Sequence, residues 1–333
     1  MIEQNFSLKN YNTFGIDVET ESFVAIQSEQ QLVKLLETKK GSPYRVLGGG
    51  SNILLTQNYK GLTIVMKNLG IELVEETSNS VVIKVQAGEN WHDLVLWALE
   101  NDYGGIENLA LIPGSVGAAP IQNIGAYGVE LESVFHSCKV LDIEPLSFKT
   151  FDKKACSFGY RNSIFKKELK GSVIITSVNL KLQKKPHHIQ SHYGTLQTAL
   201  DGKSKTIQTV AEAVIGIRKS KLPDPNQIGN SGSFFKNPII TTHHFNKLLK
   251  KYPELPHYPD QDGCVKIPAA WMIDKLGFKG KRQGDAGVHK KQALVLVNYG
   301  NAKGSELLNL AKEIQELVFK EFEIRLEIEV NLL

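Results

Sequence analysis

The sequence predicts an α+β fold in which strands and helices form more than one subdomain. Residues 20–66 alternate short apolar strands with one helix, residues 71–185 are dominated by strands, and helices and strands alternate again from about residue 206. At roughly 100–200 residues per domain, a chain of 333 residues is long enough for two or three such units.

The spacing of apolar residues predicts the individual elements. Leucines recur at a helical spacing between Glu29 and Lys39, which predicts a helix there. Asn90 precedes another apolar run and is expected to be the N-cap of a helix over Trp91–Leu99. The polar stretch 186–205 is expected to be a linker or a mobile loop. Further helices are expected over Thr206–Lys219, Ala269–Leu276 and Ser305–Phe319, and strands over Phe23–Ile26, Tyr44–Leu47, Leu62–Met66, Val81–Val85, Val173–Leu180, Ala293–Tyr299 and Glu323–Val330.

Composition and charge favour an ordinary soluble enzyme. The hydrophobic content of 41% and the charged content of 22% are typical of globular proteins. The net charge of +4 is mild and the lysines are scattered, so binding of nucleic acid is not expected. No apolar run reaches about 18 residues and the N-terminus has no signal pattern, so neither a membrane span nor export is expected.

The three cysteines Cys138, Cys156 and Cys264 are far apart in the sequence. Their number and spacing argue against a disulfide framework and a zinc site, and they favour a reducing compartment. The histidines form no metal-binding pattern either. We therefore expect a cytoplasmic enzyme without a metal.

Two glycine-rich segments are candidates for binding a cofactor. Gly48–Asn52 (GGGSN) follows a predicted strand, and glycines there would let successive N–H groups face an anion such as a pyrophosphate. The spacing is not the GxGxxG fingerprint, and a plain glycine turn is the alternative. The run Ala110–Gly128 is apolar but broken by glycine and proline, and such a segment needs partners for its backbone groups. If both segments bind the same ligand, that ligand is expected to be a nucleotide-containing cofactor. For the second segment, the alternative is a loop without function.

Three other segments contain residues that could carry chemistry. Arg161 lies among aromatic residues and could hold a carboxylate, although a buried structural ion pair is the alternative. Glu327 and Glu329 would share one side of the final strand, where solvent exposure is the alternative. Ser233, in GNSGSFFKNP, could be a nucleophile, a helix cap, a phosphate ligand or none of these. The chain contains no G-x-S-x-G motif, which disfavours a serine hydrolase of the α/β-hydrolase kind.

Six motifs together resemble one family. GGGSN, IPGSVGAAPIQNIGAYG, FGYRNSIF, KLPDP, GSFFKNP and LEIEV occur in an order and spacing similar to those of the UDP-N-acetylenolpyruvoylglucosamine reductases, the MurB family. The similarity extends over nearly the whole chain, from Tyr11 to Val330. The segment Ser191–Gly194 resembles the longer form of the family, in which a tyrosine-bearing loop folds over the substrate.

The resemblance implies a flavoenzyme of peptidoglycan precursor synthesis. NADPH would reduce a non-covalently bound FAD, which would then reduce UDP-N-acetylglucosamine enolpyruvate to UDP-N-acetylmuramate. It also implies an FAD-binding fold of the vanillyl-alcohol-oxidase (PCMH) type followed by an α+β substrate-binding domain. The FAD-binding subdomains would be residues 1–67 and 68–205, the latter with the substrate loop near 186–200. The substrate domain would be residues 206–325, and the strand 326–333 would carry the catalytic glutamate. We expect a monomer whose partners are small molecules.

The resemblance assigns roles to residues by position. Ser233 matches the proton donor, and Arg161 and Glu329 match the groups that stabilise the enol intermediate. Ile328 stands where relatives often have proline. The implied FAD contacts are Gly48, Gly49, Gly50, Ser51, Asn52, Pro113, Gly114, Ser115, Gly117, Ala118, Ile121, Gln122, Asn123, Gly125, Ala126 and Tyr127, and the implied substrate contacts are Tyr193, Lys221, Asn237, Tyr258, Lys279 and Gln292.

Two rival functions are compatible with parts of the pattern. An FAD oxidase acting on a small alcohol could share the fold, but many such oxidases attach the flavin through a histidine, and neither glycine-rich segment contains one. A nucleotide-sugar-binding protein without turnover is the other alternative, in which Ser233, Arg161 and Glu329 would have no catalytic role.

Overall fold

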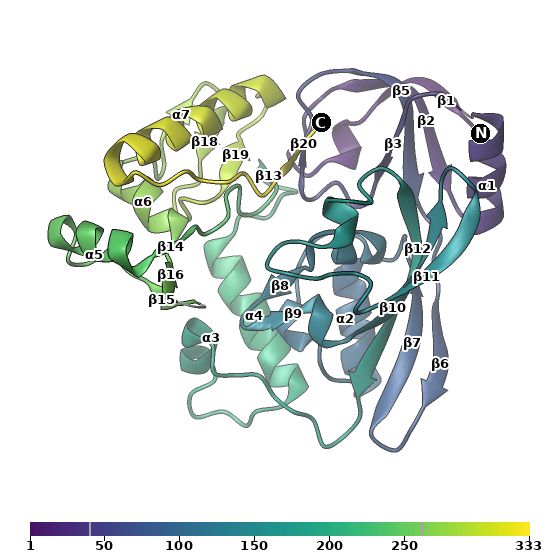
Figure 1. Cartoon of the computed structure of the whole chain (residues 1–333), viewed down its shortest axis with the longest axis horizontal. Helices are drawn as coiled ribbons and strands as arrows, with labels where there is room; N and C mark the ends of the chain where they lie inside the picture. Colours follow the sequence, from purple (N-terminus) through teal and green to yellow (C-terminus); the bar gives the residue numbers. More distant parts are fainter. Residues whose placement is uncertain (40, 261–262) are drawn as a thin grey trace. The chain divides into compact units, whose positions relative to one another are not determined.

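The computed structural model describes residues 1–39, 41–260 and 263–333 (Figure 1). The chain folds into two compact units, each built from segments that are discontinuous in the sequence. Unit 1 comprises residues 1–6, 20–50 and 59–220, and unit 2 comprises residues 7–19, 51–58 and 221–333.

The first sheet of unit 1 has the strand order β1-β2-β5-β3, and β5 runs parallel to both β2 and β3. Helix α1 begins where Ser28 accepts a hydrogen bond from the Gln31 amide. Its leucines are buried in a small core with residues of β2 and β5 such as Ile26 and Ile64. The elements are β1 (Glu3–Ser7), β2 (Glu19–Ile26), α1 (Glu29–Thr38), β3 (Tyr44–Leu47) and β5 (Tyr59–Met66).

The second sheet of unit 1 is antiparallel, with the order β11-β10-β12-β7-β6 (Figure 1). Apolar residues of β7, β10 and β12 form the larger core together with helices α2 and α4. Its helices and strands are β6 (Ile71–Glu76), β7 (Ser80–Gln86), α2 (Trp91–Glu100), β8 (Gly125–Ala126), β9 (Val129–Glu130), β10 (Phe135–Asp142), β11 (Ser147–Asp152), β12 (Val173–Gln183), α3 (Gly194–Ala199) and α4 (Ile207–Lys221), with short 3-10 helices at Glu107–Leu109, Val116–Gln122, Leu131–Ser133 and Ile164–Lys166.

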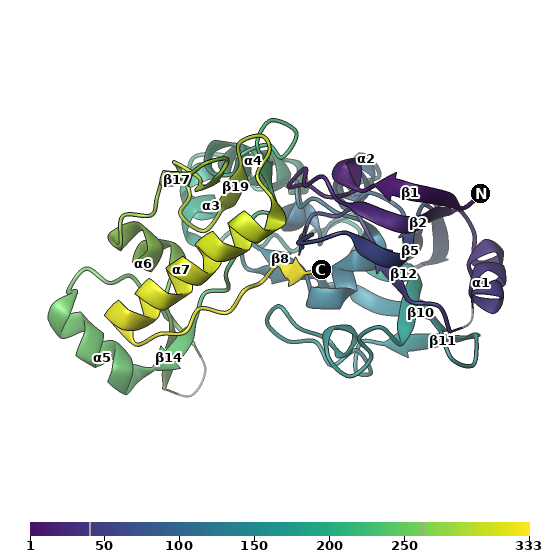
Figure 2. The same cartoon turned by 90° about the horizontal axis from the view of Figure 1, so that it is seen from above.

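Unit 2 contains the small sheets β13-β19-β18-β17 and β14-β16-β15, with α7 in contact with β18 and β19. Figure 2 shows the extended yellow segment that follows α7 and leads to the C-terminus. The elements are a 3-10 helix at Lys9–Tyr11, β4 (Ile53–Leu54), β13 (Gly229–Asn230), β14 (Ile239–Thr241), α5 (Thr242–Lys251), β15 (Tyr258–Pro259), β16 (Cys264–Lys266), α6 (Ala269–Lys275), β17 (Arg282–Gln283), β18 (Ala286–Val288), β19 (Leu296–Asn298), α7 (Gly304–Phe322) and β20 (Asn331–Leu332).

The final strand expected over Glu323–Val330 is wrong. Glu323 ends α7 in a left-handed conformation, φ +57°, and the only regular strand beyond it in the described part of the chain is β20. An isolated antiparallel bridge between Phe235 and Ile328 takes the place of a longer ladder. Ile324, Leu326 and Val330 are buried, which explains why apolar residues alternate with polar ones over residues 324–330. No continuous strand pairs with this segment in the described part of the chain.

The expectation of an irregular stretch at 186–205 is wrong in part, because α3 forms there. Leu196, on α3, is fully buried in the larger core of unit 1, so packing stabilises a helix that the polar sequence does not suggest. Among the residues that the structure describes, no helix is both long enough and apolar enough to cross a membrane.

Candidate active site

The two glycine-rich segments lie against each other in unit 1. A Cβ on Gly48 would come within 2.6 Å of the Ser115 Oγ, and one on Gly49 within 2.7 Å of the Gly114 Cα. Real Cβ atoms do not approach other atoms so closely. The neighbour of Gly49 is backbone, so a side chain there would push the second segment away, whereas the neighbour of Gly48 is a serine hydroxyl group that could rotate. The two segments are therefore in close contact, and their convergence on one ligand stays a prediction.

Backbone hydrogen bonds join the second glycine-rich segment to the turn that precedes α2. The amide of Val116 donates to the Glu89 carbonyl (2.8 Å), and that of Gly117 to the Ala87 carbonyl (2.9 Å). A Cβ on Gly117 would lie only 2.5 Å from the Ala87 Cβ. Part of the hydrogen bonding that this irregular run requires is thus supplied by the protein itself.

Asn123, which sequence similarity implies as an FAD contact, has a role in the protein framework. It ends the 3-10 helix in the left-handed region, φ +45°, and its side chain is fully buried. Its Nδ2 donates to Glu130 Oε2 (2.9 Å), and its Oδ1 accepts from the Glu132 amide (2.9 Å). The Asn123 side chain therefore fixes the turn that presents Gly125 to Tyr127.

Tyr127 and Tyr193 lie together in unit 1. Their rings meet edge to face, with centroids 5.8 Å apart. The backbone carbonyl of Tyr127 accepts a hydrogen bond from Asn108 Nδ2 (3.0 Å), which fixes the position of the residue. Burial raises the pKa of the Tyr127 hydroxyl group. Tyr193 stands at the start of α3 with 49% of its surface exposed. The structure thus brings one predicted cofactor residue and one predicted substrate residue into contact.

Arg161 lies against the same segment. It occupies a tight turn in which Gly159 and Asn162 bridge, and its own φ is +53°. Its Nη2 donates to the Gly125 carbonyl (2.8 Å), and its guanidinium lies 5.4 Å from the centre of the Tyr160 ring. The backbone of the predicted cofactor segment therefore orients the Arg161 guanidinium.

Arg218 is a functional candidate that the motifs did not single out. Its Nε donates to the Leu111 carbonyl (3.2 Å). Burial lowers its pKa, the Tyr127 hydroxyl raises it, and the charge of Arg161 lowers it. Val210, Val214 and Arg218 are spaced four residues apart along α4, so Arg218 lies on the apolar face of that helix. A cation on an apolar helix face is the sequence signal that could have identified Arg218.

The turn that carries Ser233 is built in unit 2. A Cβ on Gly229 would lie 2.2 Å from the Phe14 carbonyl oxygen, and Gly232 has φ +69°. Phe234 and Phe235 are buried and their rings meet edge to face, so they pack the turn onto unit 2. The Ser233 side chain remains exposed.

Glu329 lies on the segment paired with this turn. Its amide donates to the Phe234 carbonyl (2.9 Å), and the Lys236 amide donates to the Glu327 carbonyl (2.9 Å). Lys236 and Glu327 also form a side-chain ion pair. Unit 2 therefore places Ser233 and Glu329 on adjacent segments, whereas Arg161 belongs to unit 1.

Ser51 and Asn52, from the end of the first glycine-rich segment, belong to unit 2. Asn52 Nδ2 donates to the Glu329 carbonyl (3.3 Å), and the Asn52 carbonyl accepts from the Asn331 amide (3.0 Å). β4 and β20 continue this pairing in parallel. A predicted cofactor residue and a predicted catalytic residue are thus hydrogen-bonded neighbours.

The implied substrate residues differ in what holds them. Asn237 Oδ1 accepts from the Ala269 amide at the start of α6 (3.0 Å), and Gln292 Oε1 accepts from the Leu294 amide (3.3 Å). Lys279 pairs with Asp274 (2.6 Å). Besides Tyr193, the side chains of three implied substrate residues are exposed: Lys221, at the end of α4, Tyr258, on β15, and Lys279.

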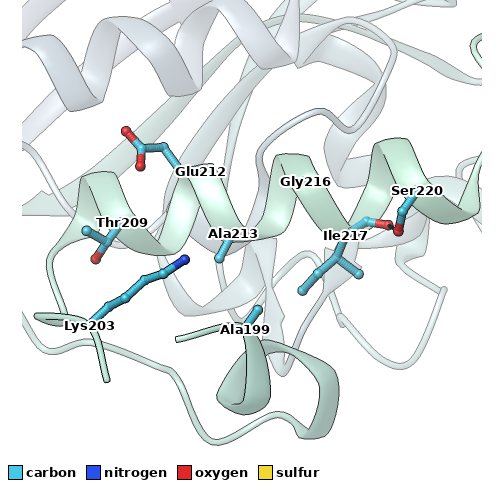
Figure 3. A pocket seen from close by; sticks show the side chains of 8 residues that line it. All are labelled: Ala199, Lys203, Thr209, Glu212, Ala213, Gly216, Ile217 and Ser220. Atoms are coloured by element: carbon cyan, nitrogen blue, oxygen red, sulfur yellow. Dashed lines mark hydrogen bonds between the residues drawn. The ribbon is translucent and has the colours of Figure 1, made fainter. Parts of the chain in front are cut away.

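A pocket of about 370 Å³ lies between α3 and α4 in unit 1 (Figure 3). It contains none of the residues implied to bind cofactor or substrate. Gly216 leaves space on α4, and Ser220 Oγ bonds its own helix at the Ile217 carbonyl (2.8 Å). The lining residues are Ala199, Lys203, Thr209, Glu212, Ala213, Gly216, Ile217 and Ser220.

Comparisons with known proteins decide the family. Residues 224–333 match the family model for the C-terminal domain of UDP-N-acetylenolpyruvoylglucosamine reductase, and residues 20–144 match an FAD binding domain. The UDP-N-acetylenolpyruvoylglucosamine reductase of Flavobacterium johnsoniae is 51% identical over 100% of this chain and 99% of its own length. The chain belongs to the UDP-N-acetylenolpyruvoylglucosamine reductase family.

Other members of the UDP-N-acetylenolpyruvoylglucosamine reductase family support the assignment. The enzyme of that name from Pseudomonas putida is 44% identical over 99% of this chain and 98% of its own. The crystal structure of the reductase from Thermus caldophilus superposes with a TM-score of 0.71 at 24% identity, covering 100% of this chain and 98% of that one. The predicted α+β fold, with an FAD-binding domain of the vanillyl-alcohol-oxidase type, is confirmed.

The residues present fit a non-covalently bound FAD. The close approach of Gly49 to Gly114 leaves no side chain between the two backbones. Arg218 is a half-buried cation that interacts electrostatically with Tyr127 in unit 1. Neither Gly48–Asn52 nor Ala110–Gly128 contains a histidine that could form a covalent link to flavin.

Proposed function

We propose that this protein reduces UDP-N-acetylglucosamine enolpyruvate to UDP-N-acetylmuramate with NADPH, as the UDP-N-acetylmuramate dehydrogenase of peptidoglycan precursor synthesis. The observation that carries the proposal is 51% identity, over the full chain, to a relative named UDP-N-acetylenolpyruvoylglucosamine reductase. The adjacency of Ser233 and Glu329 in unit 2 supports it independently.

When bound, FAD supplies the hydride chemistry, because it can take a hydride from NADPH and deliver one to the enolpyruvyl group. Gly48 and Gly49, with Gly114 and Ser115, would line its site, and Arg218 would offset negative charge there. The remaining implied FAD contacts come from the same two segments. One hydride and one proton add across the double bond, which balances the conversion of NADPH to NADP⁺.

Ser233 would give the proton. Its hydroxyl group is exposed at a turn that buried aromatic residues hold rigidly, which suits a group that must reach one carbon of the substrate. A serine hydroxyl is a weak acid, but the acceptor is a strongly basic carbanion-like centre, so the transfer can proceed. No histidine base and no covalent intermediate are needed.

Arg161 and Glu329 would stabilise the enol intermediate. Negative charge moves toward the substrate carboxylate as the hydride arrives, and a preorganised guanidinium lowers the energy of that charge. The bond from Arg161 to the Gly125 carbonyl supports such preorganisation. Glu329 would assist by hydrogen bonding, from a segment whose backbone is fixed on both sides by Phe234 and Asn52.

The UDP-sugar would be held by the residues that the family resemblance implies. Lys221 and Lys279 carry charges that suit the diphosphate, and Tyr193 would close on the UDP moiety from its exposed position beside Tyr127. Asn237, Tyr258 and Gln292 would complete the contacts.

We further propose that the enzyme acts as a monomer in the cytoplasm, with small molecules as its partners and without binding nucleic acid or membrane. Its three cysteines are all free, which suits a reducing compartment.

The decisive experiment is spectroscopic. The purified protein should be yellow with flavin absorption bands, NADPH should bleach them, and UDP-N-acetylglucosamine enolpyruvate should restore them without oxygen. A colourless protein that cannot be reconstituted with FAD overturns the proposal. Reoxidation by oxygen with an alcohol substrate, and not by the enolpyruvyl ether, would identify an oxidase instead.

A further inference from the structure

Leu111 holds a backbone conformation that is unfavourable for its residue type. Its φ is +58°, in the left-handed region that residues other than glycine rarely occupy. It lies three positions before Gly114, whose Cα is the close neighbour of Gly49. The conformation of Leu111 therefore sets the direction in which the proposed cofactor segment begins.

Side chains from two helices hold both polar groups of Leu111. Its amide donates to Nδ1 of His92 on α2 (3.1 Å), and its carbonyl accepts from Nε of Arg218 on α4 (3.2 Å). Strained backbone persists only where its surroundings fix it from several sides. His92 and Arg218 supply that constraint in a segment without regular secondary structure.

The hydrogen bond fixes the protonation state of His92. A backbone N–H can only donate, so Nδ1 must carry a lone pair and the ring proton must lie on Nε2. A protonated ring would direct a second N–H at the Leu111 amide and break the contact. The contact with Leu111 therefore exists only while His92 is neutral.

The surroundings of His92 favour the neutral form. Burial lowers its pKa, Asp93 beside it raises it, and Lys219 and Arg218 on α4 lower it. The ring also belongs to the first turn of α2, where the helix dipole disfavours a positive charge. Two cations and the helix terminus therefore favour the neutral ring, and one carboxylate favours the protonated ring.

We infer that neutral His92 is a positioning residue for FAD binding, which acts by holding Leu111 so that the segment through Gly114 lies against Gly49. The inference rests on the proposed function, because it takes FAD as the ligand, and it gives His92 no contact with FAD. It predicts that FAD affinity falls as pH drops through the pKa of His92, which lies below the ordinary value for histidine.

The test measures the Kd of FAD for the apo-protein by quenching of flavin fluorescence, from about pH 8 to about pH 5. His92→Leu removes the acceptor at similar volume, and His92→Asn places Oδ1 near the position of Nδ1. We expect His92→Leu to bind FAD about tenfold more weakly at pH 8 and to lose the acid-dependent step. We expect His92→Asn to restore affinity and to show no such step.

A readout without FAD separates positioning from general damage. Hydrogen exchange of the Leu111 amide in the apo-protein should be faster in His92→Leu than in wild type, and restored in His92→Asn. His136→Leu, at an exposed histidine on β10, is the matched control and should bind FAD as wild type does.

The outcomes are distinguishable. His92→Leu that binds FAD as tightly as wild type, with the same pH dependence, overturns the inference and leaves the proposed function intact. If His92→Leu does not fold, wild type must still lose affinity at low pH while His92→Asn does not, and equal losses overturn the inference. A wild-type protein that binds no FAD at any pH overturns the proposed function and the inference with it.

Discussion

The amide of Glu329 donates a 2.9 Å hydrogen bond to the carbonyl oxygen of Phe234, the residue directly after Ser233. Backbone groups alone make this contact, so it positions two proposed catalytic side chains without using either of them. Replacement of either side chain should therefore change the chemistry while leaving the two segments in place.

Ser233→Ala should separate the two halves of the reaction. Reduction of the flavin by NADPH should continue at nearly the wild-type rate, because it needs no proton from Ser233. Reduction of the substrate should slow by about 100-fold or more, the usual contribution of a general acid. Stopped-flow absorbance measures both steps.

Ser305→Ala, at an exposed serine near the start of α7, is the matched control and should leave both steps unchanged. Unaltered substrate reduction by Ser233→Ala would remove Ser233 from the mechanism, and would fit a protein that binds the nucleotide sugar without turnover.

Gly49→Ala should weaken FAD binding. The new methyl group would lie 2.7 Å from the Gly114 Cα, so the two segments must separate at a cost of about 1–3 kcal/mol. We expect about a tenfold or larger increase in the Kd of FAD, measured by fluorescence titration.

Gly216→Ala provides the contrast in the same unit. A Cβ there meets nothing within 4 Å, and the residue lies inside α4. This change should leave FAD affinity unaltered and increase the free energy of unfolding by about 0.5–1 kcal/mol. Equal FAD affinities of the Gly49 and Gly216 variants would contradict the close approach of the glycine segments.

Asn237 should contribute to stability as well as to the proposed substrate binding. Asn237→Ala removes the acceptor for the Ala269 amide and should lower the free energy of unfolding by about 1 kcal/mol. Asn237→Asp keeps that acceptor and adds a negative charge at the N-terminus of α6, so it should remain stable. Denaturant titration and the substrate KM separate the two effects: the Asp variant should change KM alone, and an unaltered unfolding midpoint in the Ala variant would contradict the capping role.

Glu107 should make stability depend on pH. Burial raises the pKa of its carboxyl group, whereas its own and neighbouring backbone amides, including that of Gly105, and the charge of His187 lower it. A raised folded-state pKa means that the protonated form is favoured on folding. Its contribution to stability is present below the unfolded pKa of 4.5 and is lost as pH rises through the folded-state pKa.

Glu107→Gln removes this titration. Relative to wild type, the variant should gain free energy of unfolding as pH rises from about 4.5 to about 7, because a tenfold difference in proton affinity between the folded and unfolded states is worth about 1.4 kcal/mol. Denaturant unfolding across this range measures the difference, with Glu144→Gln at an exposed site as control. Parallel stability profiles for wild type and Glu107→Gln would refute the role assigned to burial.

Many of the helices and strands could be predicted because short sequence patterns determine them without partners that are distant in the chain. Asn90 caps α2 as expected, accepting from the His92 and Asp93 amides, because an asparagine before an apolar run needs no distant partner. The strand predicted over Glu323–Val330 does not form. The alternation of apolar and polar residues there indicates which side chains are buried, but a strand also needs a neighbouring strand to pair with.

The candidate site was harder to predict than the elements. The motifs identified Ser233 and Glu329, but their adjacency depends on long-range backbone pairing that neither segment encodes by itself. Arg218 and His92 lie outside all six motifs, and only Arg218 has a signal in the sequence, its position on the apolar face of α4. Their importance comes from Leu111, whose left-handed conformation appears only in three dimensions.

The interleaving of the units has a consequence for folding and for dissection of the protein. Unit 2 needs residues 7–19 and 51–58 as well as 221–333, so no single cut releases it. A fragment starting at residue 221 would lack Phe14, which packs on Phe234, and Ile53, which pairs with Asn331. Contacts between such distant parts of the chain raise the contact order, so we expect slow folding, with Ser233 reaching its final environment only after the early segments have docked.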